Sequence, residues 1–229
     1  MAFVIPRNGV GLCDCGDRII VLDIDRDRYL ELKPELATLV RSGAKGSDLG
    51  PSQTDALMQS GLFGAAAGPC PWDCAAITAA ERSIVGTEHP YVFGVRFAFR
   101  YVVSAAWLAF FHLTVGRCTL RALVDIANAP ARAADVSNEA HAAKLGMWLS
   151  AFCRAALLFP RASRCLPDAL ALQRLVTRYA VRSKIVFGVQ TDPFQAHCWV
   201  QLDGTVLGQS LETVAGFRAI LLLPMNTMP

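Results

Sequence analysis

One short segment, Arg164-Cys165-Leu166-Pro167-Asp168, fixes where a helix must begin. Proline is tolerated only in the first turn of a helix, because its ring fixes φ and removes a backbone N–H. The apolar residues that follow at helical spacing supply a buried face; they are Leu170, Leu172, Leu175 and Val176. The sequence therefore predicts a helix that starts at or just after Cys165, with the sulfur at its N-terminus.

The start of that helix is a suitable environment for a reactive thiol. Unpaired backbone N–H groups and the helix dipole favour a thiolate over a thiol at this end. The backbone N–H of Cys165 is also free to bind a developing oxyanion. On this evidence alone, a second interpretation stays open, in which Cys165 is a small buried hydrophobic residue.

A histidine in a strand-like segment complements the cysteine. His197 follows Cys165 by 32 residues and lies within Gln195-Ala196-His197-Cys198-Trp199-Val200. A cysteine on a helix and a histidine on a strand can form a thiolate–imidazole pair, so we expect covalent acyl chemistry. The other three histidines fall in a predicted loop or in predicted helices, where structural or solvated roles are expected: His89, His112 and His141.

Composition and charge exclude several classes of protein. A chain of 229 residues with 53% hydrophobic content can bury a core and is not disordered. Its 22 basic and 19 acidic residues form no basic run, which argues against a nucleic-acid partner. The N-terminus has no apolar run typical of a signal peptide, and the most apolar segment, 101–116, is too short for a bilayer. We therefore expect a cytoplasmic protein with no membrane partner.

The eight cysteines are expected to be free thiols in a reducing compartment. Four of them are candidates for a four-thiolate zinc site: Cys13, Cys15, Cys70 and Cys74. Their spacing does not match common zinc motifs, and no histidine lies near them. We therefore expect no metal and no cofactor.

The first part of the chain has a β-rich pattern. Residues 10–32 predict a three-stranded meander with turns at 15–17 and 25–27. Two short helices are expected to begin at Pro34 and Pro51. A stretch rich in glycine, alanine and proline, 61–71, is interpreted as a linker.

The second part is helical and then β-rich. The expected helices are 97–115, 120–127, 139–159 and the helix at Cys165, and the expected strands are 184–190, 196–202 and 205–209. The fold class is therefore α+β, with a β-meander plus helices in domain 1–80. Helices followed by a C-terminal antiparallel sheet make up domain 81–229.

Several segments together resemble the B protein of lasso peptide biosynthesis, a transglutaminase-like cysteine peptidase. They are Cys165-Leu166-x-x-Ala169-Leu170-Ala171-Leu172, Ile185-Val186-Phe187-Gly188-Val189, Phe194-x-Ala196-His197-x-Trp199-Val200 and Asp203-Gly204. The similarity covers roughly residues 90–223. The N-terminal meander, with Asp23-x-Asp25-x-x-x-Tyr29-x-x-Leu32, is similar to the precursor-recognition element that occurs fused to that peptidase or encoded beside it.

The resemblance implies a role for each part. Domain 1–80 is expected to be winged-helix-like and to bind the leader of a ribosomally made precursor peptide. Domain 81–229 is expected to have a papain/transglutaminase-like fold and to hydrolyse the bond between leader and core through Cys165 and His197. The freed core would pass to an ATP-dependent, asparagine-synthetase-like lasso cyclase.

An extended leader can add as a further strand to an exposed sheet edge, here 28–32, beside the second helix. The expected leader-binding residues are Arg28, Tyr29, Leu30, Glu31, Leu32, Asp55 and Met58. For Tyr29 and Leu30, a place in the core of the small domain is equally well supported.

The third catalytic position departs from the family pattern. An aspartate usually follows the histidine by twelve residues, and the residue here is Gln209. A three-residue hairpin loop with Gly204 in the left-handed conformation would pair 201 with 205 and 197 with 209, leaving Asp203 at the turn. We therefore predict that Gln209 orients His197, with Asp203 as the alternative third member. A glutamine oxygen can accept the imidazole N–H, but it has no charge to stabilise imidazolium.

Two other functions remain open at this point. One is a transglutaminase-like acyltransferase, which joins amides where a peptidase cuts them. The other is a non-catalytic, leader-binding chaperone whose peptidase half is degenerate, an idea that gains support from the missing aspartate.

Overall fold

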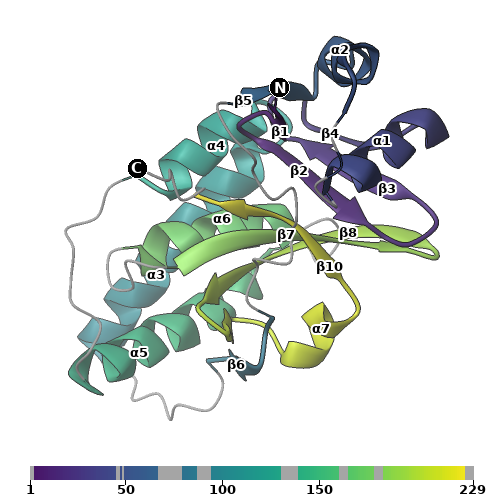
Figure 1. The fold of residues 1–229 in the computed structure, drawn as a ribbon. Helices are drawn as coiled ribbons and strands as arrows, with labels where there is room; N and C mark the ends of the chain where they lie inside the picture. The colour runs from purple at the N-terminus through teal and green to yellow at the C-terminus, as the bar shows by residue number, and fades with distance from the viewer. Residues whose placement is uncertain are drawn as a thin grey trace. The chain divides into compact units, whose positions relative to one another are not determined.

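A computed structural model describes most of the chain (Figure 1). The described residues are 3–44, 47, 49–66, 79–86, 94–129, 139–159, 165–177 and 183–224, without the side chains of Phe3, Ala66 and 139–143. They form two compact units. The first comprises Met1–Ile77, Val189–Gln195 and Arg218–Leu221, and the second comprises Thr78–Gly188, Ala196–Phe217 and Leu222–Pro229. The expected boundary at residue 80 stays a prediction.

The first unit contains the predicted meander. Its elements are β1 (Phe3–Pro6), β2 (Val10–Asp14), β3 (Ile19–Asp23), β4 (Arg28–Glu31), α1 (Pro34–Ala44), α2 (Pro51–Gln59) and β5 (Phe63–Ala66). Strands β2, β3 and β4 form an antiparallel sheet in that order, which confirms the meander. The interpretation of 61–71 as a linker is wrong for its first part, because β5 pairs with β1 and Phe63 is buried.

Both faces of the meander are covered within this unit. On one face Leu12, Val21 and Leu30 pack with apolar side chains of α1 and α2. On the other face the ring of Tyr29 lies 5.8 Å from that of Phe194. The winged-helix-like description stays a prediction.

The second unit combines helices with a five-stranded sheet. Its elements are β6 (Arg82–Ile84), α3 (Val95–Thr114), α4 (Leu120–Ala127), α5 (Glu139–Ala156), α6 (Cys165–Val176), β7 (Ser183–Thr191), β8 (Phe194–Leu202), β9 (Thr205–Leu207), α7 (Leu211–Ala215) and β10 (Arg218–Leu223), although the β7–β8 tip and most of β10 belong to the first unit. The strand order is β10-β7-β8-β9-β6. The predicted antiparallel sheet is wrong at one edge, because β6 runs parallel to β9. The sequence analysis missed β6, α7 and β10.

Helix α6 is largely buried within the second unit and contacts α3, α4 and α5. Leu170, Leu172 and Leu175 are buried, as the apolar spacing predicts. Gln173 is buried as well, and its Nε2 donates to Asn128 Oδ1 at 2.8 Å and to the Ser183 carbonyl at 3.0 Å. These bonds tie α6 to the end of α4 and the start of β7, beside which it lies in Figure 1.

Helix α3 is long and apolar enough to cross a membrane by length and composition alone, with a mean hydropathy of 1.3 over its best window. Leu108 and Phe111 are completely buried, whereas Phe99 and Leu113 are 64% and 62% exposed. The expectation of a buried helix therefore holds for one side of α3 only.

The β8–β9 hairpin differs from the predicted register. Leu202 pairs with Thr205, so the loop has two residues, Asp203 and Gly204, where we expected three. Asp203 adopts a φ of 50°, a left-handed conformation that aspartate tolerates and two-residue hairpin loops favour. The Asp-Gly pair is itself a signal for such a loop, and the predicted pairing of 197 with 209 is wrong.

The chain beyond β9 is directed by a turn at Gly208. Strand β9 ends at Leu207, and Gly208 has a φ of 74°, which favours glycine. Its N–H donates to the Ile84 carbonyl of β6 at 2.8 Å. The next residue, Gln209, is therefore placed by this turn and by β6.

Candidate active site

The nucleophile candidate lies at the start of the buried helix. Cys165 is the first residue of α6, so its N–H has no acceptor within the helix. The positive end of the helix dipole favours negative charge on the sulfur. Because α6 is anchored along its length, its packing fixes the position of Cys165.

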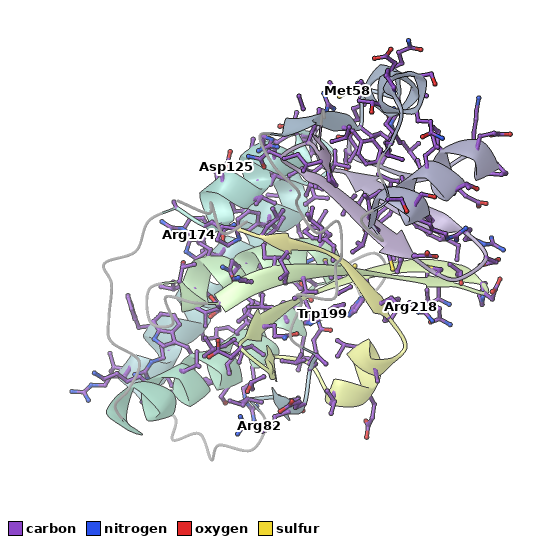
Figure 2. All side chains as sticks on the ribbon, viewed as in Figure 1. Met58, Arg82, Asp125, Arg174, Trp199 and Arg218 are labelled. Atoms are coloured by element: carbon purple, nitrogen blue, oxygen red, sulfur yellow. The ribbon has the colours of Figure 1, made fainter. Side chains whose placement is uncertain are left out.

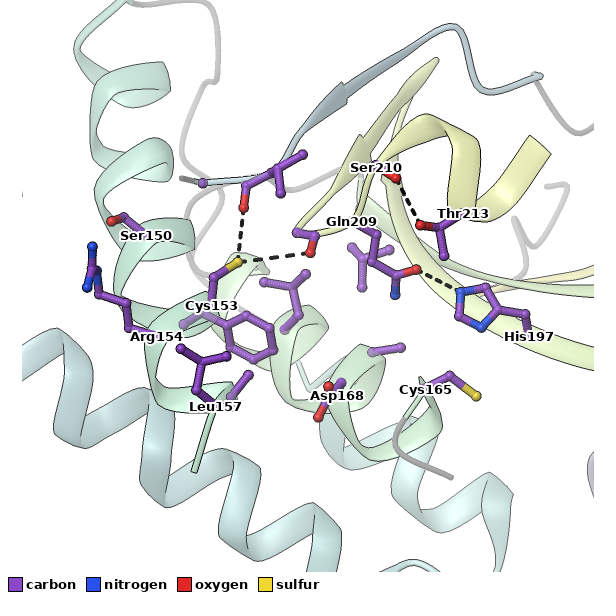
Figure 3. A pocket seen from close by; sticks show the side chains of 18 of the residues that line it. Ser150, Cys153, Arg154, Leu157, Cys165, Asp168, His197, Gln209, Ser210 and Thr213 are labelled. Carbon is purple, nitrogen blue, oxygen red and sulfur yellow. Dashed lines mark hydrogen bonds between the residues drawn. The ribbon is translucent and has the colours of Figure 1, made fainter. Parts of the chain in front are cut away.

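His197, on β8, is held by an amide. Its Nε2 lies 2.7 Å from Gln209 Oε1 (Figure 3). The orientation of that amide is set by a second bond, from Gln209 Nε2 to the Cys198 carbonyl at 3.5 Å. Since Oε1 can only accept, His197 Nε2 must donate. The other ring nitrogen, Nδ1, is then the one left for the hydrogen bond with Cys165.

The interactions of Cys165 favour its thiolate. The hydrogen bond with the Cys198 side chain, and then the hydrogen bond and charge of His197, lower the pKa of Cys165 to about 4, although burial opposes this shift. Burial lowers the pKa of His197, but its hydrogen bonds with Cys165 and Gln209 outweigh burial and raise it. Between the low pKa of Cys165 and the raised pKa of His197, the two side chains therefore form a thiolate–imidazolium pair.

A pocket of about 880 Å³ opens beside this pair. Apolar side chains supply much of its wall, among them Val85, Phe152, Leu157, Leu172 and Val200. Cys165, His197 and Gln209 line it as well, together with Asp168 and Arg154 (Figure 3). An acyl group bound to Cys165 can therefore place an apolar portion in this pocket.

Asp203 is placed elsewhere. It is exposed in the β8–β9 loop, and its carbonyl accepts a bond from Gln201 Nε2 at 2.6 Å. The structure brings Gln209, and not Asp203, to the imidazole of His197.

The remaining histidines have different surroundings. His112 Nε2 lies 3.1 Å from Asp168 Oδ1, and its ring stacks on Phe159 at 4.8 Å. His89 and the side chain of His141 lie outside the described residues.

The sequence analysis missed two residues near the nucleophile, Cys198 and Asp168. Side chains alternate along a strand, so nothing in the sequence pattern indicates that His197 and Cys198 both interact with Cys165. The sulfur of Cys165 interacts with the backbone of Cys198 as well as with the side chains of His197 and Cys198. Asp168 follows Cys165 by three residues, one helical turn, and this spacing was the available signal.

The expected leader-binding residues lie in the first unit. On β4, Arg28 and Glu31 are exposed, Tyr29 and Leu30 are half-buried, and the adjoining Leu32 is buried in the core. On α2, Asp55 is exposed and Met58 is 38% exposed (Figure 2). Leu30 and Leu32 thus contribute to the core of this unit. The other five expected leader-binding residues are exposed or, for Tyr29, half-buried.

Of the four candidate zinc ligands, the structure describes two. Cys13 and Cys15 have sulfurs 3.8 Å apart, and Cys70 and Cys74 lie outside the described residues. Within the described part of the chain, no group of three or more histidine, cysteine or acidic side chains is placed to hold a metal ion.

A comparison with protein families agrees with this geometry. The model of the Transglutaminase-like superfamily matches residues 105–222, just over half of the chain. The chain belongs to this superfamily. The matched region includes Cys165, His197 and Gln209, and a transglutaminase-like domain is consistent with a cysteine peptidase or an acyltransferase. Searches of curated proteins and of solved structures gave no significant match.

The low pKa of Cys165 in this transglutaminase-like domain gives a first prediction. Thiolate forms as pH rises through the pKa, so the rate of alkylation by iodoacetamide should be nearly constant from pH 5.5 to 8. A thiol with an ordinary pKa near 8.5 loses about tenfold in rate for each pH unit over this range. Mass spectrometry of the digested protein measures the rate at each cysteine.

The control for this labelling is His197→Ala, in which part of the thiolate stabilisation is lost. Its rate at Cys165 should fall clearly between pH 8 and pH 5.5. A wild-type rate that also falls tenfold per pH unit would contradict the thiolate–imidazolium pair.

Proposed function

We propose that the protein is a leader peptidase of lasso peptide biosynthesis, which hydrolyses the leader–core bond of a ribosomally made precursor. The observation that carries this proposal is the set Cys165, His197 and Gln209, with a low thiol pKa and a fixed imidazole tautomer. Membership of the transglutaminase-like superfamily supports the cysteine chemistry. The resemblance of the sequence segments supports the lasso assignment.

The proposed reaction has two steps. The Cys165 thiolate attacks the scissile carbonyl, and the His197 imidazolium gives its Nδ1 proton to the departing amine of the core. Water, activated by the neutral imidazole, then hydrolyses the thioester and frees the leader carboxylate. The N–H of Cys165 is a candidate donor to the oxyanion in both steps. The indole N–H of Trp199 is not offered as a second oxyanion donor, because it donates to Gln201 Oε1 at 3.1 Å.

The first unit supplies a place for the leader. Strand β4 is the edge of its three-stranded sheet as described, so an extended peptide can add beside it through main-chain hydrogen bonds. The exposed Arg28 and Glu31 flank that edge. After cleavage, the core is proposed to pass to the ATP-dependent cyclase in the cytoplasm.

The reaction products distinguish the proposed peptidase from an acyltransferase and from a non-catalytic chaperone. An acyltransferase would join the leader acyl group to an amine, which adds the mass of that amine, whereas hydrolysis adds water. A non-catalytic chaperone would leave the precursor intact. The intact Cys165–His197 pair argues against a degenerate site.

Replacement of the nucleophile tests the proposed peptidase. Cys165→Ala should abolish leader release, because it removes the sulfur that forms the proposed thioester. Leader affinity should stay within about threefold, since the binding surface is separate from the nucleophile. Mass spectrometry of precursor peptide incubated with protein and cyclase gives the first result, and fluorescence anisotropy of labelled leader gives the second. Undiminished cleavage would remove the cysteine mechanism.

Replacement of Gln209 tests the third member of the site. Gln209→Ala removes the acceptor that fixes His197, so the cleavage rate should fall roughly ten- to a hundredfold. Asp203→Asn is the matched control and should cost at most about threefold, because Asp203 is exposed at the loop. The reverse ranking, at unchanged thermal stability, would make Asp203 the orienting residue.

Proline scanning of β4 tests the leader-binding edge in the full-length chain. Leu30→Pro should weaken leader binding more than Leu30→Ala, because proline cannot donate a strand hydrogen bond. Glu31→Pro and Glu31→Ala repeat the test at an exposed position, where packing changes least. Equal losses for proline and alanine at Glu31, with the fold intact by circular dichroism, would exclude strand addition along β4.

A further inference from the structure

A carboxylate lies in the wall of the pocket that holds the candidate nucleophile. Asp168 follows Cys165 by three residues on α6, and both line the pocket together with His197 (Figure 3). Residues three apart on a helix are neighbours on its surface, with Cβ atoms about 5–6 Å apart. A single amino-acid residue bound in the pocket can therefore contact both the sulfur and the carboxylate.

The position of this carboxylate is fixed from a neighbouring helix. His112 Nε2, on α3, lies 3.1 Å from Asp168 Oδ1, and the imidazole stacks on the ring of Phe159 with the ring centroids 4.8 Å apart. A carboxylate oxygen can only accept, so His112 Nε2 donates. The side chains of His112 and Asp168 are only 18% and 13% exposed. The hydrogen bond therefore holds the carboxylate in a largely buried part of the pocket wall.

We propose that Asp168 is a specificity-determining residue, which binds the ammonium group of a lysine-like side chain on the substrate residue whose carbonyl Cys165 attacks. His112 is the positioning residue that holds Asp168. This inference rests on the proposed function, in which that residue is the last one of the leader, and it adds the chemical class of its side chain.

The pocket suits a side chain with an apolar stem and a positively charged end. Phe152, Leu157 and Leu172 supply apolar wall, against which the methylene groups of a lysine can pack. Among the described residues that line the pocket, Asp168 is the only acidic one. A charge-assisted hydrogen bond from an ammonium is stronger than one from a neutral amide, and partial burial strengthens it further. Lysine is therefore favoured over glutamine, and glutamine over an apolar side chain of the same length.

Two other features of the site are compatible with this role. Arg154 lines the same pocket from α5 but is exposed, so water screens its charge more than that of Asp168. A carboxylate accepts several hydrogen bonds at once, so an ammonium can bind while His112 stays in place. If the bond between His112 and Asp168 served only to join α3 to α6, the reaction rate would not depend on a charge at the end of the substrate side chain.

The experiment measures how fast short peptidyl chloromethyl ketones alkylate Cys165 in the full-length protein. These reagents place a ketone where the scissile carbonyl would lie, and they differ only in the last side chain: lysine, glutamine, norleucine or glutamate. Trypsin releases residues 165–174 as a peptide with one cysteine, so mass spectrometry measures the labelling directly. The lysine reagent should react about ten- to a hundredfold faster than the norleucine reagent, with glutamine between them and glutamate slowest.

Three variants test which residues set this preference, and the rate with iodoacetamide corrects each for changes in the thiol itself. Asp168→Ala should bring the lysine and norleucine rates to within about twofold of each other. His112→Phe keeps a ring beside Phe159 but removes the donor, so the lysine preference should fall at least about threefold. The matched control is Asp125→Asn, which removes an acidic charge from the exposed side of α4, outside the pocket lining, and should leave the preference unchanged.

Equal rates for the lysine and norleucine reagents in the wild type would overturn the proposal, and this comparison needs no variant to fold. A lysine preference that survives Asp168→Ala would overturn it as well, and one that is unchanged in His112→Phe would overturn the positioning role of His112. If iodoacetamide labels Cys165 but none of the ketones does, the proposed peptidase fails together with this inference. Equal labelling by all the ketones, in contrast, would leave the peptidase in place.

Discussion

The candidate site depends on how helix α6 is fixed. Its apolar side is buried, and the buried amide of Gln173 bonds both the end of α4 and the start of β7. Because buried side chains along the helix and the amide in its last turn fix α6, the position of its first residue, Cys165, is fixed as well. As the first residue of α6, Cys165 also has a backbone N–H with no acceptor within the helix, which makes it a candidate oxyanion donor.

The orientation of the imidazole depends on one amide. The bond from Gln209 to the Cys198 carbonyl leaves Oε1 for His197, and this sets the tautomer. An aspartate would set the same tautomer and also add a negative charge. Gln209 therefore orients His197 without adding a charge, and the Cys165 thiolate is stabilised by the His197 imidazolium, by the hydrogen bonds that it accepts and by the helix start.

The helices and the Cys165–His197 pair were predictable because each depends on local signals. Proline and apolar spacing placed the start of α6, and the meander followed from alternating strands and turn residues. Strand β6 was not predictable in this way, because its three residues gain their place by parallel pairing with a distant strand. The contact between Gln209 and His197 was predicted from an incorrect register, since Gly208 turns the chain where continued pairing was assumed. Cys198 was missed because the alternation of side chains along β8 does not indicate that Cys165, at the start of α6, interacts with the backbone of this strand.

Strand β6 sets a lower limit on the fragment that can retain the site. The superfamily match begins at residue 105, yet the Ile84 carbonyl accepts the N–H of Gly208, and the Val85 carbonyl accepts the thiol of Cys153. A truncation designed from the match alone would delete this edge and free the turn that carries Gln209. A fragment meant to retain the candidate site must therefore begin before Arg82, upstream of the region that the superfamily model matches.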